Sequence, residues 1–344
     1  MGIMTVNGVI AKTELGITSP HEHALIDISN QYPGDRTPGS LGWDGKVSRE
    51  HYDRLMADPY ALRDNLMIDD EETAISEVAK FAAAGGRSFV DVTTPCIGRN
   101  VRFLKRLAER TGLNVVAACG FYTADAHPAR IAKLSMEEIA DELTDELVTG
   151  IDGSGVRAGI IGEIGTSREL LPGEGKTLRA AALAQKETDL AVQVHVYPWC
   201  ANGLAATDIL FRYGVRPDRI VICHSDVTPD RAYIAELLRR GVYVQLDNFG
   251  KEFTPEPGGF AAGRFITDKE RAELAAWIIK SGHEDQLLLT NDICLKCMLK
   301  ACGGGGYAHI FETVLPLLAT LGVPEKLLEE KIMRANPLAM LCGR

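Results

Sequence analysis

Short runs of β-branched and other apolar residues alternate along the chain with longer segments that have a helical period. The runs lie at 16–23, 88–94, 114–122, 158–165, 191–197, 220–226, 242–250 and 287–292. The segments between them place apolar residues every three to four positions, as in "DEETAISEVAKFAAAGG" at 70–86, where two glycines mark the helix end. A strand followed by a helix, repeated in this way, predicts an α/β fold with a parallel sheet.

The eight predicted strands favour a closed (β/α)8 TIM barrel over an open sheet. They are almost continuously apolar, and no G-x-G-x-x-G motif follows the first of them, as a dinucleotide-binding sheet would require. A length of 344 residues suits one barrel, so residues 1–344 are expected to form a single domain. Two long segments, 28–66 and 249–266, are predicted loop insertions at the barrel mouth, serving either as lids or as surface decoration.

Composition and charge limit the kinds of molecule that the protein is expected to bind. The formal net charge is −10 and no long cluster of lysine and arginine occurs, which argues against nucleic acid. The chain has no apolar stretch of membrane-spanning length and no secretion signal at its start, so we expect a cytoplasmic protein without a membrane partner. A small-molecule substrate is expected, with a homodimer as one option for its assembly. Cys294 and Cys297 form a C-x-x-C pair, but no second pair completes a structural zinc site.

Two histidines end the first predicted strand, in "GITSPHEHALID" at 16–27. In a strand, residues i and i+2 face the same side, so His21 and His23 are predicted to point together into the barrel. Paired imidazoles in that place can hold a metal ion. The alternative is a pair of core histidines that hydrogen-bond to their neighbours. Their place at the carboxyl end of a strand favours the first interpretation, because barrel enzymes build their active sites on that face.

Other predicted strands end in similar side chains. Glu163 ends the fourth, His195 the fifth, His224 the sixth and Asp292 the eighth. These groups should therefore meet His21 at one mouth of the barrel. Four imidazoles and two carboxylates are costly to bury unpaired, and two divalent cations would compensate them. The sequence thus predicts a binuclear metal site.

With these residues in place, the sequence resembles the phosphotriesterase family of the amidohydrolase superfamily, and within it the branch of phosphotriesterase-related proteins. The resemblance is carried by "GITSPHEH", "RAGIIGEIGTS", "VQVHVYP", "VICHSD", "LTNDI" and "GGGGYAHI". It implies a barrel with two divalent metal ions, usually zinc. It also implies that His21, His23 and Asp292 bind the more buried ion, and that His195 and His224 bind the more exposed one.

The fourth strand departs from the name-giving phosphotriesterases. Those enzymes bridge their metals with a carboxylated lysine, but "AGIIGEIG" contains no lysine. Glu163 is then the bridging candidate, as in the phosphotriesterase-related branch. This change leaves a binuclear centre in place and lowers the expectation of phosphotriester hydrolysis.

The expected chemistry is hydrolysis by a metal-activated hydroxide. Asp292 is the candidate base that accepts the proton of this hydroxide and passes it to the leaving group, and its alternative role is that of a ligand only. The leading function is cleavage of a carboxylic amide, ester or lactone, with an anionic tail on the substrate as an option. The alternatives are a phosphotriesterase (aryldialkylphosphatase) and a non-enzymatic ligand-binding barrel.

Substrate selection is expected to come from the loops. Lys251, Arg264 and Lys296 are candidates to bind an anionic substrate, or else they are solvated surface charges. Tyr122 and Tyr307 are candidates to touch the substrate, or else they only pack against neighbours.

Overall fold

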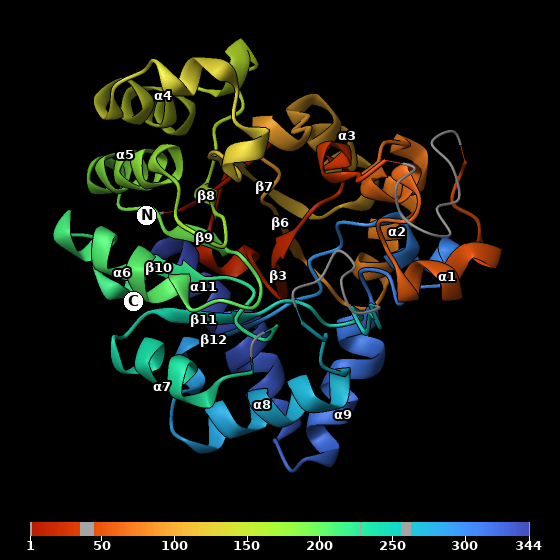
Figure 1. Ribbon diagram of the computed structural model, residues 1–344. Coiled ribbons are helices and arrows are strands. Elements are labelled where there is room, and N and C mark those ends of the chain that lie inside the picture. Colours follow the sequence, from red (N-terminus) through yellow and green to blue (C-terminus); the bar gives the residue numbers. More distant parts are fainter. Residues whose placement is uncertain (1, 35–44, 228, 256–262, 344) are drawn as a thin grey trace.

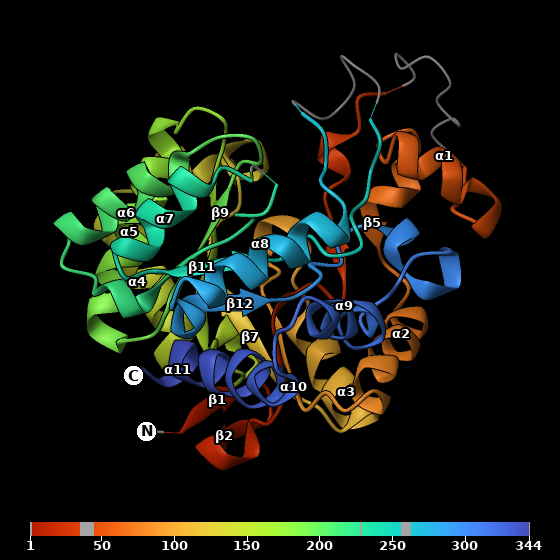
Figure 2. The same ribbon diagram turned by 90° about the horizontal axis from the view of Figure 1, so that it is seen from below.

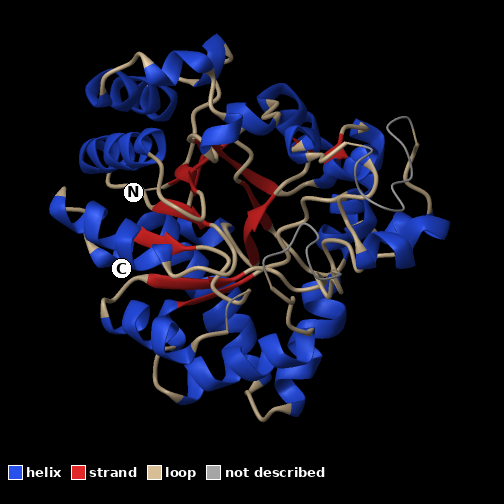
Figure 3. Ribbon diagram, viewed as in Figure 1, coloured by secondary structure: helices blue, strands red, loops and turns tan. Residues whose placement is uncertain are grey.

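Eight parallel strands stand at the centre of the protein in the computed structural model, which describes residues 2–34, 45–227, 229–255 and 263–343. Each neighbouring pair follows chain order, so the sheet wraps around as the predicted (β/α)8 barrel (Figures 1 and 3). Every predicted run contains one strand. The strands are β3 (Thr18–Glu22), β6 (Ser88–Asp91), β7 (Asn114–Cys119), β8 (Ile160–Thr166), β9 (Val192–Val196), β10 (Ile220–Ile222), β11 (Tyr243–Leu246) and β12 (Leu287–Leu289).

Helices surround the barrel (Figure 3). The segment after Asp70 shows why they form. The Asp70 side chain accepts a hydrogen bond from the Thr73 amide at 2.7 Å and so caps the helix start, while Ile75, Val78 and Phe81 are buried on one face. The helices are α1 (Tyr52–Ala57), α2 (Glu71–Ala83), α3 (Val101–Thr111), α4 (Met136–Val148), α5 (Pro172–Thr188), α6 (Asn202–Arg212), α7 (Arg231–Arg239), α8 (Asp268–Lys280), α9 (Leu315–Thr320), α10 (Glu325–Leu327) and α11 (Asn336–Cys342).

A buried carboxylate joins the first and last strands of the barrel. Glu22, at the end of β3, is fully buried and accepts hydrogen bonds from the amides of Asn291 at 3.1 Å and Ile293 at 2.8 Å. The hydroxyl of Thr290 lies 2.6 Å from the same carboxylate. These bonds close the barrel between β3 and β12 and fix the segment that carries Asp292.

The opposite end of the barrel forms a floor. A hairpin of β1 (Ile3–Thr5) and β2 (Gly8–Ile10) lies there, and the amide of Val6 donates to the carbonyl of Val115 near the start of β7 at 2.8 Å. Helix α11 covers the same end, where Met340 and Leu341 pack with inward-facing strand residues. Both termini therefore lie together at the end of the barrel away from the carboxyl ends of the strands (Figure 2).

Both predicted insertions extend beyond the carboxyl ends of strands, and parts of them, 35–44 and 256–262, lie outside the described residues. In the first insertion, β4 (Ile26–Asp27) pairs with β5 (Met67–Ile68), and α1 lies between them. None of the helices in the described part of the chain combines the length and the apolar character needed to cross a membrane.

Candidate metal centre and substrate cavity

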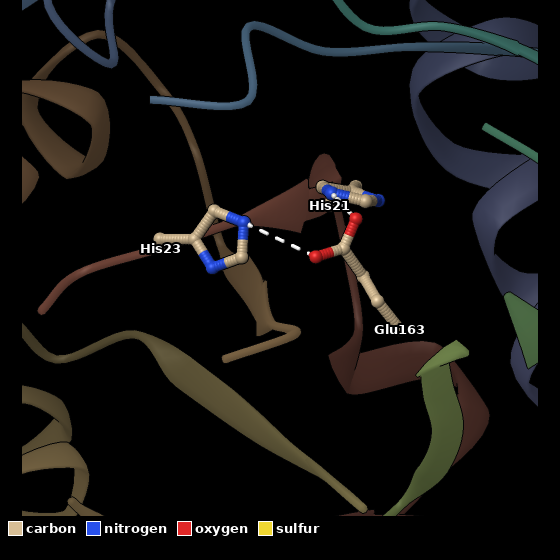
Figure 4. Close-up of side chains that lie close together, drawn as sticks. All are labelled: His21, His23 and Glu163. Carbon is tan, nitrogen blue, oxygen red and sulfur yellow. Dashed lines mark ion pairs between the residues drawn. The ribbon is translucent and has the colours of Figure 1, made fainter. Parts of the chain in front are cut away.

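A carboxylate from β8 lies between two histidines from β3 at the carboxyl end of the barrel. His21 Nε2 is 3.3 Å from Glu163 Oε1, and His23 Nε2 is 3.7 Å from Glu163 Oε2 (Figure 4). The two rings turn a nitrogen toward opposite oxygens of the carboxylate. All three side chains are buried. The alternation of side chains along a strand thus brings His21 and His23 to one face, as the sequence predicts.

The remaining strand-end groups join this cluster. Asp292 Oδ1 is 3.2 Å from His23 Nε2 and 3.5 Å from His21 Nε2. On the other side of Glu163, its Oε1 atom is 3.3 Å from His195 Nδ1 and 3.4 Å from His224 Nε2. These two ring nitrogens are 2.8 Å apart.

These separations fit metal ligands. Two ligand atoms that are each about 2.1 Å from one tetrahedral ion lie about 3.4 Å apart. The distances from the histidine nitrogens to the Glu163 and Asp292 oxygens lie close to that value. In addition, His21 Nε2 is buried and has no hydrogen-bond partner among the described residues, although two carboxylates face it. A cation between these atoms would satisfy all of them.

Partners on the far side of the rings orient the histidines. The Thr93 hydroxyl donates to the Leu25 carbonyl, so it accepts a hydrogen bond from His23 Nδ1 at 2.9 Å. Asp247 Oδ1 lies 2.9 Å from His224 Nδ1. In both rings the proton is thereby assigned to Nδ1, and the Nε2 lone pair faces the centre.

His21 is oriented by two glutamines. The Gln193 side chain donates from Nε2 to the Pro20 carbonyl, which turns its Oε1 toward His21 Nδ1 at 2.8 Å. Gln245 Nε2 approaches the same ring nitrogen at 2.9 Å. Together the glutamines fix the plane of the imidazole, and its Nε2 points at the carboxylates.

Two residues of the centre have left-handed backbone conformations. His224 has φ of 55° and Asp292 has φ of 50°. This region is unfavourable for residues other than glycine and persists only where the surroundings impose it. His224 lies two residues beyond the end of β10 and Asp292 three residues beyond the end of β12, and the turn aims their side chains inward.

The electrostatics of the cluster favour a positive charge at its centre. Burial lowers the pKa of His21, but the neighbouring Cys223 thiol and Glu163 carboxylate outweigh burial and raise this pKa well above its ordinary value. Burial also opposes ionisation of Glu163, yet His21 and His195 hold the pKa of this carboxyl well below its usual range. Both the raised pKa of His21 and the lowered pKa of Glu163 indicate that positive charge is stabilised here, and divalent cations would supply it.

A cavity of about 450 Å³ opens beside the cluster. His195, His224 and Asp292 form part of its inner lining. The rest of the lining is largely aromatic and apolar, with a few polar groups. It comprises Ile28, Gln31, Tyr60, Tyr122, Thr123, Asp125, Ser167, Arg168, Tyr197, Pro198, Trp199, Asn248, Lys251, Phe253, Phe265, Cys294 and Leu295.

Of the predicted substrate residues, Tyr122 and Lys251 reach this cavity. The Tyr122 ring lies 4.7 Å from the His195 ring, centroid to centroid. Lys251 is buried and forms an ion pair with Asp292. This pairing outweighs the effect of burial and raises the pKa of the lysine, so its ammonium group is held charged beside the metal centre.

The other three predicted substrate residues lie outside the cavity lining. The Arg264 side chain is 66% exposed and pairs with Glu270. Lys296 pairs with Asp64 and Asp69, each at 2.8 Å. The Tyr307 ring is buried, and its hydroxyl donates to the His23 carbonyl at 2.6 Å. Tyr307 thus stabilises the backbone at the end of β3 and lies outside the cavity lining.

Sequence analysis missed the groups that orient the histidines. Asp247 follows β11 directly, so it lies at the carboxyl end of a strand, as the predicted ligands do. Gln193 and Gln245 are polar residues inside apolar strands, two residues before His195 and Asp247. By alternation they face the same interior, which is the signal that could have found them. Arg168, on the loop after β8, carried no such signal.

Comparisons with known proteins agree with this arrangement. The sequence profile of the phosphotriesterase family matches residues 1–341. The N-acetyltaurine hydrolase of Xenopus tropicalis is 32% identical over 338 residues, which cover 97% of this chain and 96% of the relative. The phosphotriesterase-related protein of Nematostella vectensis is 33% identical over 342 residues, covering 98% and 97%.

A solved structure shares the fold closely. The resiniferatoxin-binding protein from Rhodobacter sphaeroides superposes with a TM-score of 0.94 and 35% identity, covering 99% of this chain and 94% of that one. The family profile and the curated relatives span nearly the whole chain. The chain therefore belongs to the phosphotriesterase family and is a hydrolase.

Proposed function

We propose that this hydrolase is a binuclear metal enzyme that cleaves a carboxylic amide, ester or lactone. The observation that carries the proposal is the convergence of four histidines and the Asp292 carboxylate around Glu163, with His21 Nε2 lacking any other partner among the described residues. The similarity to N-acetyltaurine hydrolases, whose name denotes cleavage of an amide, supports a carboxylic substrate. Zinc is the proposed metal, because it suits imidazole and carboxylate ligands.

Each ligand has a proposed place. His21, His23 and Asp292 would hold the more buried ion, His195 and His224 would hold the other, and Glu163 is placed to serve both. When bound, the ions lower the pKa of a water molecule and polarise the scissile carbonyl.

The protein's own groups handle the proton. Asp292 is the proposed acceptor of the proton from the attacking water and its donor to the leaving group. Lys251 keeps this carboxylate ionised, because its ammonium group, together with His21, holds the pKa of Asp292 well below its usual range despite burial. The carboxylate is therefore ionised and fixed in orientation before reaction. Tyr122 borders the reaction space next to His195.

Glu163→Gln tests the bridge. Replacing one carboxylate oxygen by an amide group removes a negative charge between two cations, so at least one ion should be lost and turnover should fall by about a hundredfold or more. Elemental analysis of the purified variant and a hydrolysis assay measure both effects. Glu77→Gln is a matched control, since Glu77 is a buried glutamate outside both the metal cluster and the cavity lining. Full occupancy and full rate in Glu163→Gln would remove this residue from the centre.

Phosphotriester hydrolysis is the second candidate, and the aromatic lining of the cavity is the observation that favours it. Neutral aryl phosphotriesters suit such a lining better than charged amides do. A screen of N-acyl amino acids, lactones, aryl esters and a diethyl aryl phosphate with the metal-loaded protein separates the candidates. If only the phosphotriester is cleaved, the carboxylic assignment fails. If none is cleaved while metal is bound, a different reaction must be sought.

A further inference from the structure

The cavity lining carries one cation besides the histidines that no carboxylate of the described residues neutralises. Lys251 is paired with Asp292, whereas Arg264 and Lys296 lie outside the lining and have acidic partners of their own. Arg168 lines the cavity and is exposed to solvent. Within the described part of the chain its guanidinium forms no ion pair.

The loop that carries Arg168 is firmly anchored. Glu174 is fully buried, and its carboxylate accepts hydrogen bonds from the amides of Ser167 and Leu171, each at 3.0 Å. The same carboxylate accepts from the amide of Ala124, also at 3.0 Å, on the loop after β7. One buried carboxylate therefore holds together two loops that line the cavity.

A second bridge fixes the backbone of Arg168 itself. The side-chain amide of Asn202, at the start of α6, donates to the carbonyls of Ser167 at 2.7 Å and Arg168 at 2.9 Å. The backbone around the arginine is thus tied to both neighbouring loops, while its side chain has no carboxylate partner among the residues that the structure describes. A fixed backbone reduces the conformational entropy lost when the side chain orders around a ligand.

The nearby wall is apolar and held in an unusual conformation. Trp199 has φ of 65°, and its Nε1 donates to the Arg264 carbonyl at 3.2 Å. Its ring meets the Phe265 ring edge-on, with centroids 5.1 Å apart. A bulky residue in a left-handed conformation at a cavity indicates a constraint imposed by function. The cavity therefore offers an aromatic surface for an apolar group and a guanidinium for an anion.

One acid also lies on the lining. Asp125 Oδ1 accepts a hydrogen bond from the Thr123 hydroxyl at 2.5 Å, and Oδ2 accepts one from the Asn30 amide group at 3.0 Å. Both oxygens are thus engaged by neutral donors of the protein. Arg168 is therefore the charged side chain of the described lining that can pair with an incoming group, and its guanidinium selects a carboxylate or sulfonate.

We propose that Arg168 is the residue that selects an anionic substrate, by pairing with a carboxylate or sulfonate that is separated from the scissile carbonyl. This inference rests on the proposed hydrolysis of a carboxylic amide. Arg168 follows Glu163 by five residues, so their Cα atoms are at most about 18 Å apart. The substrate class is an N-acyl amino acid or N-acyl aminosulfonate whose acyl group lies on the aromatic wall.

The first test compares charged and neutral substrates of equal shape. An N-acyl amino acid, the matched N-acyl aminosulfonate and the uncharged N-acyl amino-acid amide are assayed with metal-loaded wild type, Arg168→Gln and Arg168→Lys. Arg168→Gln should lower kcat/KM for both anions by about tenfold to a hundredfold, mainly through KM, and leave the neutral amide unchanged. Arg168→Lys should retain part of the preference. Arg264→Gln, which alters an exposed arginine outside the lining, should behave as wild type.

A binding measurement separates this inference from the proposed reaction. An alkanesulfonate has no bond to hydrolyse, and the matched alkyl methyl sulfone is its neutral counterpart. Calorimetry with metal-loaded protein should show tighter binding of the sulfonate, lost in Arg168→Gln and weakened by salt. If this pattern holds while none of the amides is cleaved, the proposed reaction fails and the anion site stands. If Arg168→Gln changes charged and neutral compounds equally, or neither, the inference is wrong.

Discussion

At the scale of single residues, the orientation of each imidazole depends on the group that hydrogen-bonds to the ring nitrogen facing away from the cluster. Asp247 fixes His224 in this way and also accepts hydrogen bonds from the His224 amide, at 3.0 and 3.1 Å. Burial lowers the pKa of His224, but Asp247 outweighs it and raises this pKa to about 10. A carboxylate behind a metal-binding histidine increases the basicity of the ring and holds its tautomer.

We expect Asp247→Asn to weaken metal retention by about tenfold to a hundredfold, because the amide holds the ring less firmly and carries no charge. Metal content after dialysis against graded chelator concentrations measures the change. Asp208→Asn alters an exposed aspartate that pairs with Arg240, so its metal content should match wild type. Equal retention in both variants would show that Asp247 has no part in holding the centre.

The clustering of the candidate ligand residues could be predicted from sequence because their positions depend on two local rules. Strand alternation places His21 and His23 on one face, and strand ends place Glu163 and Asp292 at one mouth. Substrate residues follow no local rule. Arg264 and Lys296 turn away because acids from the same loop or from distant segments bind them, and such pairs depend on the path of the whole chain.

At the scale of elements, helix α8 anchors the loop that follows β11. Arg271 is fully buried, with its Nε atom 3.1 Å from Asp226 Oδ2, and its NH2 group donates to the Lys251 carbonyl at 3.0 Å. Asp268 accepts from the Gly250 amide at 2.9 Å. The helix therefore sets the position of Lys251, whose ammonium group reaches Asp292.

Arg271→Met should destabilise the protein by about 3–5 kcal/mol, because it leaves Asp226 buried without its cation. The double variant Arg271→Met/Asp226→Asn should recover part of that loss, since Asp226 is then neutral, while Asp268 loses the arginine but keeps His309. Denaturant unfolding of the single and double variants measures the coupling. The exposed pair of Arg239 and Glu236 provides the comparison, where Arg239→Gln should leave the unfolding transition close to that of wild type, because solvent screens the pair. A similar small cost for Arg271→Met would contradict the role given to this buried pair.

The strands themselves were predictable because a parallel barrel buries both faces of each strand, which leaves nearly continuous apolar runs. The side-chain contacts that close the barrel were not predictable. They involve Glu22 and the amides of Asn291 and Ile293, residues that are far apart in sequence and have no shared pattern. These residues come into contact only in the folded barrel, where β12 lies beside β3.

At the scale of the whole molecule, the buried histidines and carboxylates of the candidate metal centre gather at one end of the barrel. We expect removal of divalent metal to lower Tm, because ions that bind only the folded state stabilise it, by about 2.7 kcal/mol at a free concentration one hundred times Kd. Calorimetric melting before and after chelation, with metal added back, measures the effect. Glu163→Gln should show a smaller difference between the two states. A Tm that chelator leaves unchanged in wild type would argue against a resident metal.

The floor built by β1, β2 and α11 has a kinetic consequence. Because Ile3, Leu15 and Met340 seal that end with buried apolar contacts, the described chain offers the reacting groups no passage through the barrel. The substrate must therefore enter the cavity along the aromatic wall, and both product fragments must leave through the same opening. The fragment that keeps the anionic group departs past Arg168 and competes there with the next arrival. Accumulating product should therefore slow the enzyme as a competitive inhibitor.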